Sequence, residues 1–271
     1  MKKRALRVLA CLAICFTLAS PAYATESGVT VTVNGTAIET GFASQVLNNR
    51  TYVSYLPIVR ALYPDATAVW ANGQAEVTAP GLKLCIKPGA KYIVANGRYL
   101  YVPDGVKVED THILVPVRTL CQALGATVTW DAATSTASII AGGTPIQSGD
   151  SYYNSNDLYW LSRIIYAESG NQSLEGKIAV GNVVLNRVAS PQFPNTVYDV
   201  IFQRNQFTPA SSGTIKRTPN EESVIAAKLC LDGANTAGNA LFFVNPKVSP
   251  NSWAARNCTL VATIGAHAFF A

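Results

Sequence analysis

The sequence predicts two domains: a β-rich α+β first half with an internal repeat, and a mainly α second half. Three observations support this. The chain has 271 residues, enough for two ordinary domains. The first half alternates apolar and polar residues up to Asn-Gly turns, a pattern typical of β-hairpins. The second half instead places apolar residues three and four apart, a spacing typical of helices.

Residues 1–24 have the features of a secretory signal peptide. Four basic residues precede an apolar run over 8–18, which is too short to cross a bilayer comfortably. Ala22-Tyr23-Ala24 is a small-x-small cleavage site. An uncleaved N-terminal anchor is the alternative for the same segment. No later segment is apolar for long enough to span a membrane, so the sequence predicts a secreted or wall-associated protein outside the cytoplasm.

The basic character of the chain comes mostly from this leader. The whole chain has 21 Lys and Arg against 16 Asp and Glu, and the leader holds four of the basic residues and none of the acidic ones. The remainder therefore has 17 against 16, a net charge of +1. No basic run with interleaved aromatic residues is present, so a nucleic-acid partner is not expected.

The first half contains an internal repeat, in which residues 52–62 align with residues 114–124. In each copy the apolar residues have helical spacing, so each is expected to contain one short helix. An Asn-Gly turn precedes each copy and a strand ending in tryptophan follows it, at 34–35 and Trp70 for the first copy and at 96–97 and Trp130 for the second.

Residues 29–141 resemble the copper amine oxidase N-terminal-like domain, and the expected domain runs from 25 to 141. The resemblance is carried by Asn96-Gly97, Leu114 to Arg118, Ala123 to Ala126 and Val128 to Asp131. The first copy departs from the pattern, with Ser54 in place of proline and two added residues at 64–65. The resemblance implies a non-catalytic binding or spacing module, for which wall glycan is one conceivable ligand. Copper is not implied, because His112 is the only histidine of this half.

Residues 142–156 are rich in Gly, Pro, Ser and Asn and are expected to form a linker without a core. The second domain is expected over 157–271. Asp157 is the expected N-cap of its first helix, because it stands just before an apolar periodic stretch.

Glu168 is the candidate catalytic residue of the second half. Leu158, Leu161 and Ile165 form an apolar stripe, and position 168 is the next on that stripe. A carboxyl at an inward-facing helix C-terminus should have a raised pKa, because burial and the helix dipole both disfavour its anion. Such a carboxyl suits general acid catalysis of glycosidic cleavage. The alternative is that the side chain turns to solvent as the helix ends at 169–171.

Several motifs of the second half, in order, resemble the SleB-type cell-wall hydrolase family of spore cortex-lytic enzymes. They cover about residues 157–270 and are Ile165 to Lys177, Ala179 to Val188, Phe193 to Thr196, Gln206 to Thr208, Ala240 to Pro246 and Ile264 to Phe269. The resemblance implies a lysozyme-like fold. It also implies lytic transglycosylase action on the bond between N-acetylmuramic acid (MurNAc) and N-acetylglucosamine (GlcNAc), with the family's catalytic acid at Glu168.

The chain departs from this family immediately after the candidate acid. Gly170 stands where an arginine is usual and Gln172 where a second glutamate is usual, so the substrate preference is open between spore cortex, cleaved at germination, and vegetative wall. Hydrolysis normally requires a second carboxylate across the cleft, and no later acidic residue lies on an obviously apolar face. The sequence therefore favours transglycosylation over hydrolysis.

Four further residues are candidates for substrate binding, as amides or aromatic platforms of a sugar cleft: Gln206, Phe207, Phe243 and Asn245. For each of them, ordinary packing or capping is the alternative. His267 is expected to be structural. No cofactor and no metal site are expected.

Other classes of wall protein are the alternatives to a glycan-cutting enzyme. A zinc amidase needs about three ligands, and the second half has only one histidine, His267. A Cys-His peptidase would pair His267 with Cys230 or Cys258. The lost charges near Glu168 also leave open a degenerate domain that binds wall without cutting it.

Four cysteines lie beyond the leader, two in each half. An even number in an exported chain favours the disulfides Cys85–Cys121 and Cys230–Cys258. Four reduced, buried thiols are the alternative.

Overall fold

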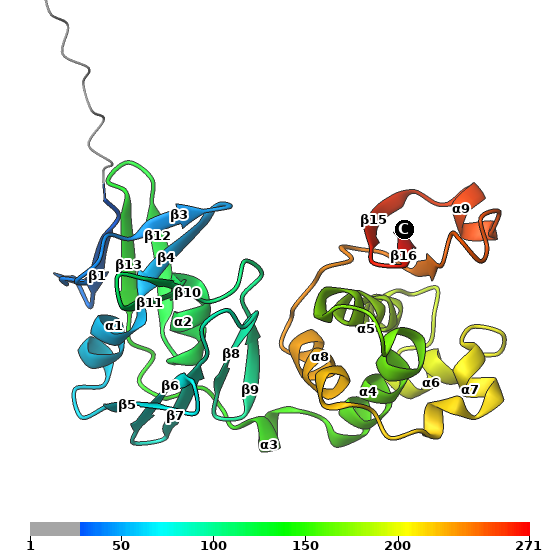
Figure 1. The fold of residues 1–271 in the computed structure, drawn as a ribbon, viewed down its shortest axis with the longest axis horizontal. Helices are drawn as coiled ribbons and strands as arrows, with labels where there is room; N and C mark the ends of the chain where they lie inside the picture. The colour runs from blue at the N-terminus through cyan, green and yellow to red at the C-terminus, as the bar shows by residue number, and fades with distance from the viewer. Residues whose placement is uncertain (1–27) are drawn as a thin grey trace, which may run out of the picture.

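The computed structural model describes residues 28–271 as two parts, each with its own hydrophobic core (Figure 1). The first part is built from strands with two short helices, and the second part is mainly helical, as expected. The expected signal peptide, residues 1–24, lies outside the described residues. Within the described range, no helix is both long and apolar enough to span a bilayer.

Three sheets form the first part, with strand orders β12-β13-β1-β2, β10-β11-β4-β3 and β5-β6-β7-β8-β9. The strands are β1 Thr30–Val33, β2 Thr36–Ala37, β3 Gln45–Leu47, β4 Arg50–Ser54, β5 Thr67–Ala71, β6 Gln74–Ala79, β7 Leu82–Ile86, β8 Tyr92–Ala95, β9 Arg98–Tyr101, β10 Lys107–Glu109, β11 His112–Pro116, β12 Thr127–Asp131 and β13 Thr136–Ile140. Two helices pack among them, α1 Tyr55–Leu62 and α2 Val117–Ala123.

The Asn-Gly turns form the hairpins that the sequence predicts. Asn96 and Gly97 both have positive φ, at 49° and 79°, and they connect the antiparallel strands β8 and β9. Asn34 and Gly35 do the same between β1 and β2. Two consecutive positive φ angles match the right-handed twist of the flanking strands, and asparagine and glycine reach them at the least cost.

The segment 142–156 is not an unpacked linker, so that expectation is wrong. Ile146 is buried in the first core. The Gly149 N–H donates to the Asn96 carbonyl oxygen at 2.8 Å, at the start of the short helix α3 (Gly149–Tyr152). Tyr153 is also buried, and its hydroxyl accepts a hydrogen bond from the Tyr99 N–H at 3.1 Å. Composition indicated flexibility, but a few apolar and aromatic side chains are enough to fasten the segment to the β8–β9 hairpin.

The second part consists of six α-helices, one 3-10 helix and a small sheet of order β14-β16-β15. The helices are α4 Ser155–Ser169, α5 Leu174–Ala189, α6 Val197–Phe202, α7 Thr208–Ser212, η1 Thr214–Lys216, α8 Glu221–Leu231 and α9 Trp253–Asn257, and the strands are β14 Phe242–Val244, β15 Leu260–Ile264 and β16 His267–Phe270. Helices α4, α5 and α8 pack against one another and enclose the second core.

Helix α4 begins earlier than expected, and its N-cap is Asn154 rather than Asp157. The Asn154 Oδ1 accepts hydrogen bonds from the N–H groups of Asn156 at 2.9 Å and Asp157 at 3.1 Å. Asp157 lies instead in the first turn, where its negative charge is favourable beside the positive end of the helix dipole.

The two parts are docked against each other through the β8–β9 hairpin. The guanidinium of Arg98, on β9, forms an ion pair with Asp232, which follows α8, and its Nε donates to Asp232 Oδ1 at 2.8 Å. Three tyrosines of the first part also pack against the second core: Tyr92, Tyr99 and Tyr101. The two parts therefore share a packed interface.

All four cysteines within residues 28–271 are free thiols, so neither expected disulfide is present. Cys121 and Cys230 are buried in different cores. Burial raises the pKa of Cys121 to about 12 and also raises that of Cys230.

We expect Cys121 and Cys230 to resist alkylation in the native protein at pH 8 and to react fully in denaturant, because the thiolate is the reactive form. Mass spectrometry of the labelled peptides measures this directly. Rapid labelling of Cys230 in the native state would contradict the burial and would revive a thiol nucleophile. Protection of the cysteines from alkylation in denaturant that is lost only when a reductant is added would contradict the free thiols.

Candidate active site

Glu168 lies in the last turn of α4, at the end of the stripe that continues from Leu161 and Ile165. Both apolar residues are fully buried, and Glu168 itself is partly buried. The next residue, Ser169, is buried and its hydroxyl donates to the Ile165 carbonyl oxygen at 2.7 Å. The helix end is therefore held firmly while the carboxyl retains access to solvent.

Burial raises the pKa of the Glu168 carboxyl above its usual range. A carboxyl removed from water loses more solvation as an anion than as an acid, so its protonated form persists to higher pH. This is the direction that a general acid requires at neutral pH. The helix ends without a left-handed residue, because Gly170 keeps a right-handed φ of −54°.

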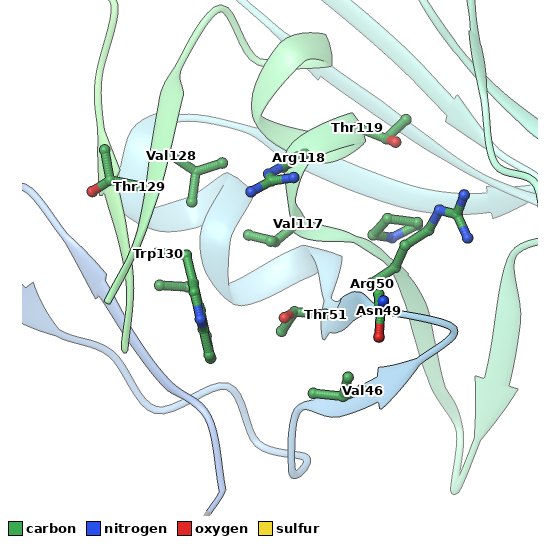
Figure 2. A pocket seen from close by; sticks show the side chains of 12 residues that line it. Val46, Asn49, Arg50, Thr51, Val117, Arg118, Thr119, Val128, Thr129 and Trp130 are labelled. Carbon is green, nitrogen blue, oxygen red and sulfur yellow. The ribbon is translucent and has the colours of Figure 1, made fainter. Parts of the chain in front are cut away.

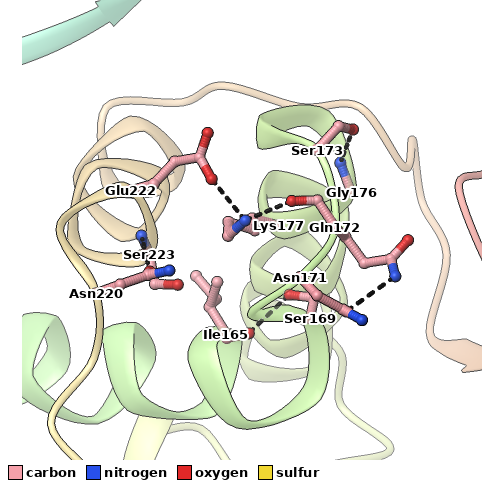
Figure 3. A network of polar contacts seen from close by, with 10 residues as sticks. All are labelled: Ile165, Ser169, Asn171, Gln172, Ser173, Gly176, Lys177, Asn220, Glu222 and Ser223. Carbon is pink, nitrogen blue, oxygen red and sulfur yellow. Dashed lines mark hydrogen bonds and ion pairs between the residues drawn. The ribbon is translucent and has the colours of Figure 1, made fainter.

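A buried lysine supports the loop that follows Glu168 (Figure 3). Lys177 on α5 is only 1% exposed, and its ammonium donates to Glu222 Oε2 at 2.6 Å and to the backbone carbonyl oxygen of Gln172. Glu222 belongs to α8 and is half exposed. The lysine thus links α5, α8 and the loop between α4 and α5. Its position on the continuously apolar face of α5 concealed it in the sequence.

We expect Lys177→Met to lower the rate of glycan cleavage several-fold without unfolding the domain. Methionine keeps most of the packing volume but loses the charged hydrogen bond to the Gln172 carbonyl, worth roughly 1.5–3 kcal/mol for a charged donor. Steady-state kinetics on solubilised wall fragments, with circular dichroism as a folding check, measure this. The matched control is Glu222→Gln, which retains an acceptor at the exposed end. A rate unchanged by Lys177→Met would show that the loop needs no such support.

Gln172 connects this loop to the C-terminal hairpin. Its side-chain Oε1 accepts a hydrogen bond from the Ala266 N–H at 3.0 Å, in the turn between β15 and β16. Gly265 in that turn has a positive φ of 57°, and a Cβ there would lie 2.3 Å from the same oxygen. Gln172, which stands where the resemblance leads us to expect a glutamate, therefore makes a structural contact with the C-terminal hairpin.

The hairpin brings an aromatic cluster to this side of the second part. Phe243 on β14 lies 5.3 Å from His267 and 5.9 Å from Phe269, measured between ring centroids. Phe207 lies 6.4 Å from Phe243. His267 is 9% exposed and burial lowers its pKa, as suits a neutral, structural histidine.

Arg187 gathers two of the remaining candidates and was missed from the sequence. It is 5% exposed, donates from Nη1 to Gln206 Oε1 at 3.1 Å and from Nε to the Leu241 carbonyl oxygen at 2.7 Å. Its guanidinium also lies 5.2 Å from the centroid of the Phe207 ring. Burial lowers its pKa to about 10. Arg187 follows the buried residues Val184 and Val183 by three and four positions, and this helical spacing could have indicated that it lies on the buried face of α5.

The four candidate substrate residues differ in exposure. Gln206 is exposed, Phe207 is buried in the second core, and Phe243 and Asn245 are half-buried. The Asn245 Oδ1 accepts from the Lys247 N–H at 3.0 Å, so it also caps a turn. Arg187 thus contacts both Gln206 and Phe207, and a tilted ring contact joins Phe207 to Phe243. Asn245 lies two residues beyond Phe243.

No group of three or more His, Cys, Asp or Glu side chains within residues 28–271 is arranged to hold a metal ion.

The fold and the site define the class of the second part: a small helical domain with a partly buried carboxyl of raised pKa at a helix end. Residues 171–270 match the family described as Cell Wall Hydrolase, and the match begins just after Glu168. The second part belongs to this family. The first part matches the Copper amine oxidase N-terminal domain over 32–139, with an overlapping match over 94–169.

The curated relatives are spore cortex-lytic enzymes. The enzyme from Bacillus cereus is 39% identical over 111 residues, which are 41% of this chain and 42% of the relative. The enzyme from Oceanobacillus iheyensis is 36% identical over 112 residues, 41% of each chain. The one from Bacillus subtilis is 35% identical over 101 residues, 37% of this chain and 33% of the relative. The chain thus spans about two fifths or less of the length of these relatives.

Two solved structures are similar to the second part. The catalytic domain of the Bacillus cereus SleB protein has 37% sequence identity and a TM-score of 0.42, with 44% of this chain and 92% of that chain covered. The catalytic domain of the germination-specific lytic transglycosylase SleB from Bacillus anthracis has 36% identity and a TM-score of 0.42, with 46% and 100% covered.

Proposed function

We propose that this chain acts outside the cytoplasm as a lytic transglycosylase, which cuts the MurNAc–GlcNAc bond of peptidoglycan with Glu168 as its acid. The observation that carries the proposal is the partly buried Glu168 carboxyl, whose pKa burial raises, at the end of α4 in a cell-wall hydrolase domain. The names of the relatives support the same reaction class.

The proposed reaction needs one carboxyl in two protonation states. Glu168 first donates its proton to the glycosidic oxygen, and the C1–O bond of the muramic ring breaks. The resulting carboxylate then accepts the proton of the muramic C6 hydroxyl, whose oxygen bonds to C1 and closes a 1,6-anhydro ring. The proton returns to Glu168, so the reaction consumes no water.

Two acidic side chains on helices α5 and α8, which pack against α4, are already paired with lysines, and this supports a single-carboxyl mechanism. Glu175 pairs with Lys91 of the first part; burial raises its pKa, but the hydrogen bond and charge of Lys91 outweigh this, so its pKa is lowered. Glu222 pairs with Lys177. Neither is a free second carboxylate of the kind that hydrolysis uses.

Product masses test the proposal. Purified spore cortex and purified vegetative wall are digested, and the released fragments are analysed by mass spectrometry. Anhydromuramic ends are the expected result, and the faster-digested wall identifies the natural substrate. Fragments that have gained a water instead would overturn transglycosylation and leave hydrolysis.

A peptidase that uses Cys230 is disfavoured, because burial raises the pKa of this thiol and leaves little thiolate to act as nucleophile. A non-enzymatic wall-binding role would be favoured if neither the unmodified chain nor Glu168→Gln reduced the turbidity of purified sacculi.

For the first part, a domain proposed to span residues 25–141 and to consist of an internal repeat, we propose a wall-binding or spacing role. The repeat is supported by two similar successions, β4 into α1 and β11 into α2, each followed by a hairpin of two strands. The leader 1–24 supports export, and 142–156 is the proposed connection to the domain 157–271.

A further inference from the structure

A hollow of about 400 Å³ opens in the first part, outside the candidate active site (Figure 2). Its lining comes from β3 and β4, from the start of α2, and from β12 with β13. These segments belong to both copies of the proposed repeat. Its volume falls in the range of about 300–1,000 Å³ that small-molecule sites usually have.

An indole forms one wall of this hollow. Trp130 on β12 is 42% exposed, and β12 is an edge strand of its sheet. Val46 on β3, also at the hollow, is 62% exposed. A flat aromatic surface with a polar N–H, left in contact with water at the mouth of a cavity, suits a ligand with one apolar and one polar face. A pyranose ring has such faces.

Polar groups complete the lining. Arg118 at the start of α2 is exposed and has no ion pair or side-chain hydrogen bond among residues 28–271. The other arginine of the hollow, Arg50, is held by Asp104 at 3.0 Å. Arg118 is therefore the cation available to an incoming anion. The hydroxyls of Thr51 and Thr129 can donate to and accept from sugar hydroxyls.

We propose that this hollow binds a glycan segment that carries a carboxylate, with the sugar ring stacked on Trp130 and the carboxylate paired with Arg118. In peptidoglycan the carboxylate is that of the stem peptide, or of muramic acid itself where the peptide is missing. The proposal rests on the proposed wall-cleaving function. It adds a second carbohydrate site, by which the chain stays on its polymer while the other part cuts.

Trp70 provides a matched control. It occupies the corresponding position after the first copy, on β5, which is also an edge strand, and it is 62% exposed. It does not line the hollow. Both tryptophans are thus exposed on edge strands, and they differ in the cavity beside them.

The test uses the full chain with Glu168→Gln, which prevents turnover, and with its four tryptophans replaced by 5-fluorotryptophan. The ¹⁹F resonances are assigned by Trp→Phe variants and followed during titration with a GlcNAc–MurNAc-peptide. We expect the Trp130 signal to shift saturably and the Trp70 signal to stay in place. Arg118→Gln should weaken this binding about tenfold, as loss of a charged anchor does. A neutral chito-oligosaccharide of equal length should bind the chain with Arg118 intact about tenfold more weakly than the GlcNAc–MurNAc-peptide does, because it has no carboxylate to pair with Arg118.

A stationary Trp130 signal would overturn the proposal, and so would equally tight binding of the neutral oligosaccharide. Failure of the proposed function is recognised separately, because the chain with Glu168 intact would then cut no wall although the Trp130 signal still shifted. Trp130→Ala in the chain with Glu168 intact should slow the digestion of intact sacculi, and an unchanged rate would count against the second site.

Discussion

Glu168→Gln is expected to lower the rate of glycan cleavage by about 10²–10⁴-fold, the usual contribution of a positioned general acid. Glutamine keeps the size and the hydrogen-bonding groups of the side chain but has no acidic proton to give to the glycosidic oxygen. Digestion of purified sacculi, followed by the release of soluble fragments, measures the rate. The matched control is Asp157→Asn, at the opposite end of the same helix α4, which should leave the rate unchanged.

The same substitution should stabilise the fold at neutral pH. The folded-state pKa of Glu168 is raised, so the folded chain binds more protons than the unfolded chain from about pH 4.5 upward, and stability falls with rising pH through that window. Glutamine stays neutral, so the Glu168→Gln variant does not lose this stability as the pH rises. We expect Glu168→Gln to raise the thermal midpoint at pH 7 and to have no effect at pH 3.

Activity and stability should therefore change in opposite directions, as they do where a site holds an unfavourably buried group. Cleavage by the unmodified chain should also decline as pH rises through the raised pKa. A Glu168→Gln variant that cuts wall at the normal rate would show that another group is the acid. A lowered thermal midpoint at pH 7 would show that the carboxylate is stabilised by contacts rather than strained by burial.

Arg98→Met is expected to destabilise the chain by about 3 kcal/mol, because breaking a buried ion pair leaves its partner charge uncompensated. The Asp232 side chain is 1% exposed, and Arg98 is 11% exposed. Methionine preserves part of the contact with Tyr152, over whose ring the guanidinium lies at 3.4 Å. Urea unfolding followed by tryptophan fluorescence measures the free energy of unfolding.

Lys91→Met is the control for this prediction, since it breaks a second ion pair across the same interface. Lys91 and Glu175 are 44% and 24% exposed, so solvent screens them and the loss should stay below about 1 kcal/mol. Separate unfolding of the two parts in Arg98→Met would show that this pair couples them. Equal, small losses in both variants would assign the docking to the tyrosines instead.

Much of the local structure was predictable because it depends on neighbouring residues alone. The hairpin at 96–97 follows from the ability of asparagine and glycine to adopt positive φ. The helix that carries Glu168 in its last turn follows from an apolar stripe with helical spacing. The raised pKa of Glu168 follows in direction from the same stripe, since the stripe indicates burial.

The contacts made by residues distant in sequence were not predictable in this way. Asn154 rather than Asp157 caps α4, because several nearby residues have equal capping propensity and the path of the chain selects among them. Segment 142–156 packs against β8–β9, although its composition is that of a linker. The N-cap of α4 and the packing of 142–156 both depend on the position that distant segments of the chain take in the fold.

For the candidate site too, the acid was predictable from the sequence, whereas its surroundings were determined by the tertiary structure. Residue order places Glu168 on the buried side of a helix end, since helical periodicity is a local property. Lys177 beneath the following loop, Arg187 beside Gln206, and the hollow at Trp130 each join segments far apart in sequence. Their positions depend on the packing of whole helices and sheets, because a side chain's partners are set by burial and by competing hydrogen bonds across the fold.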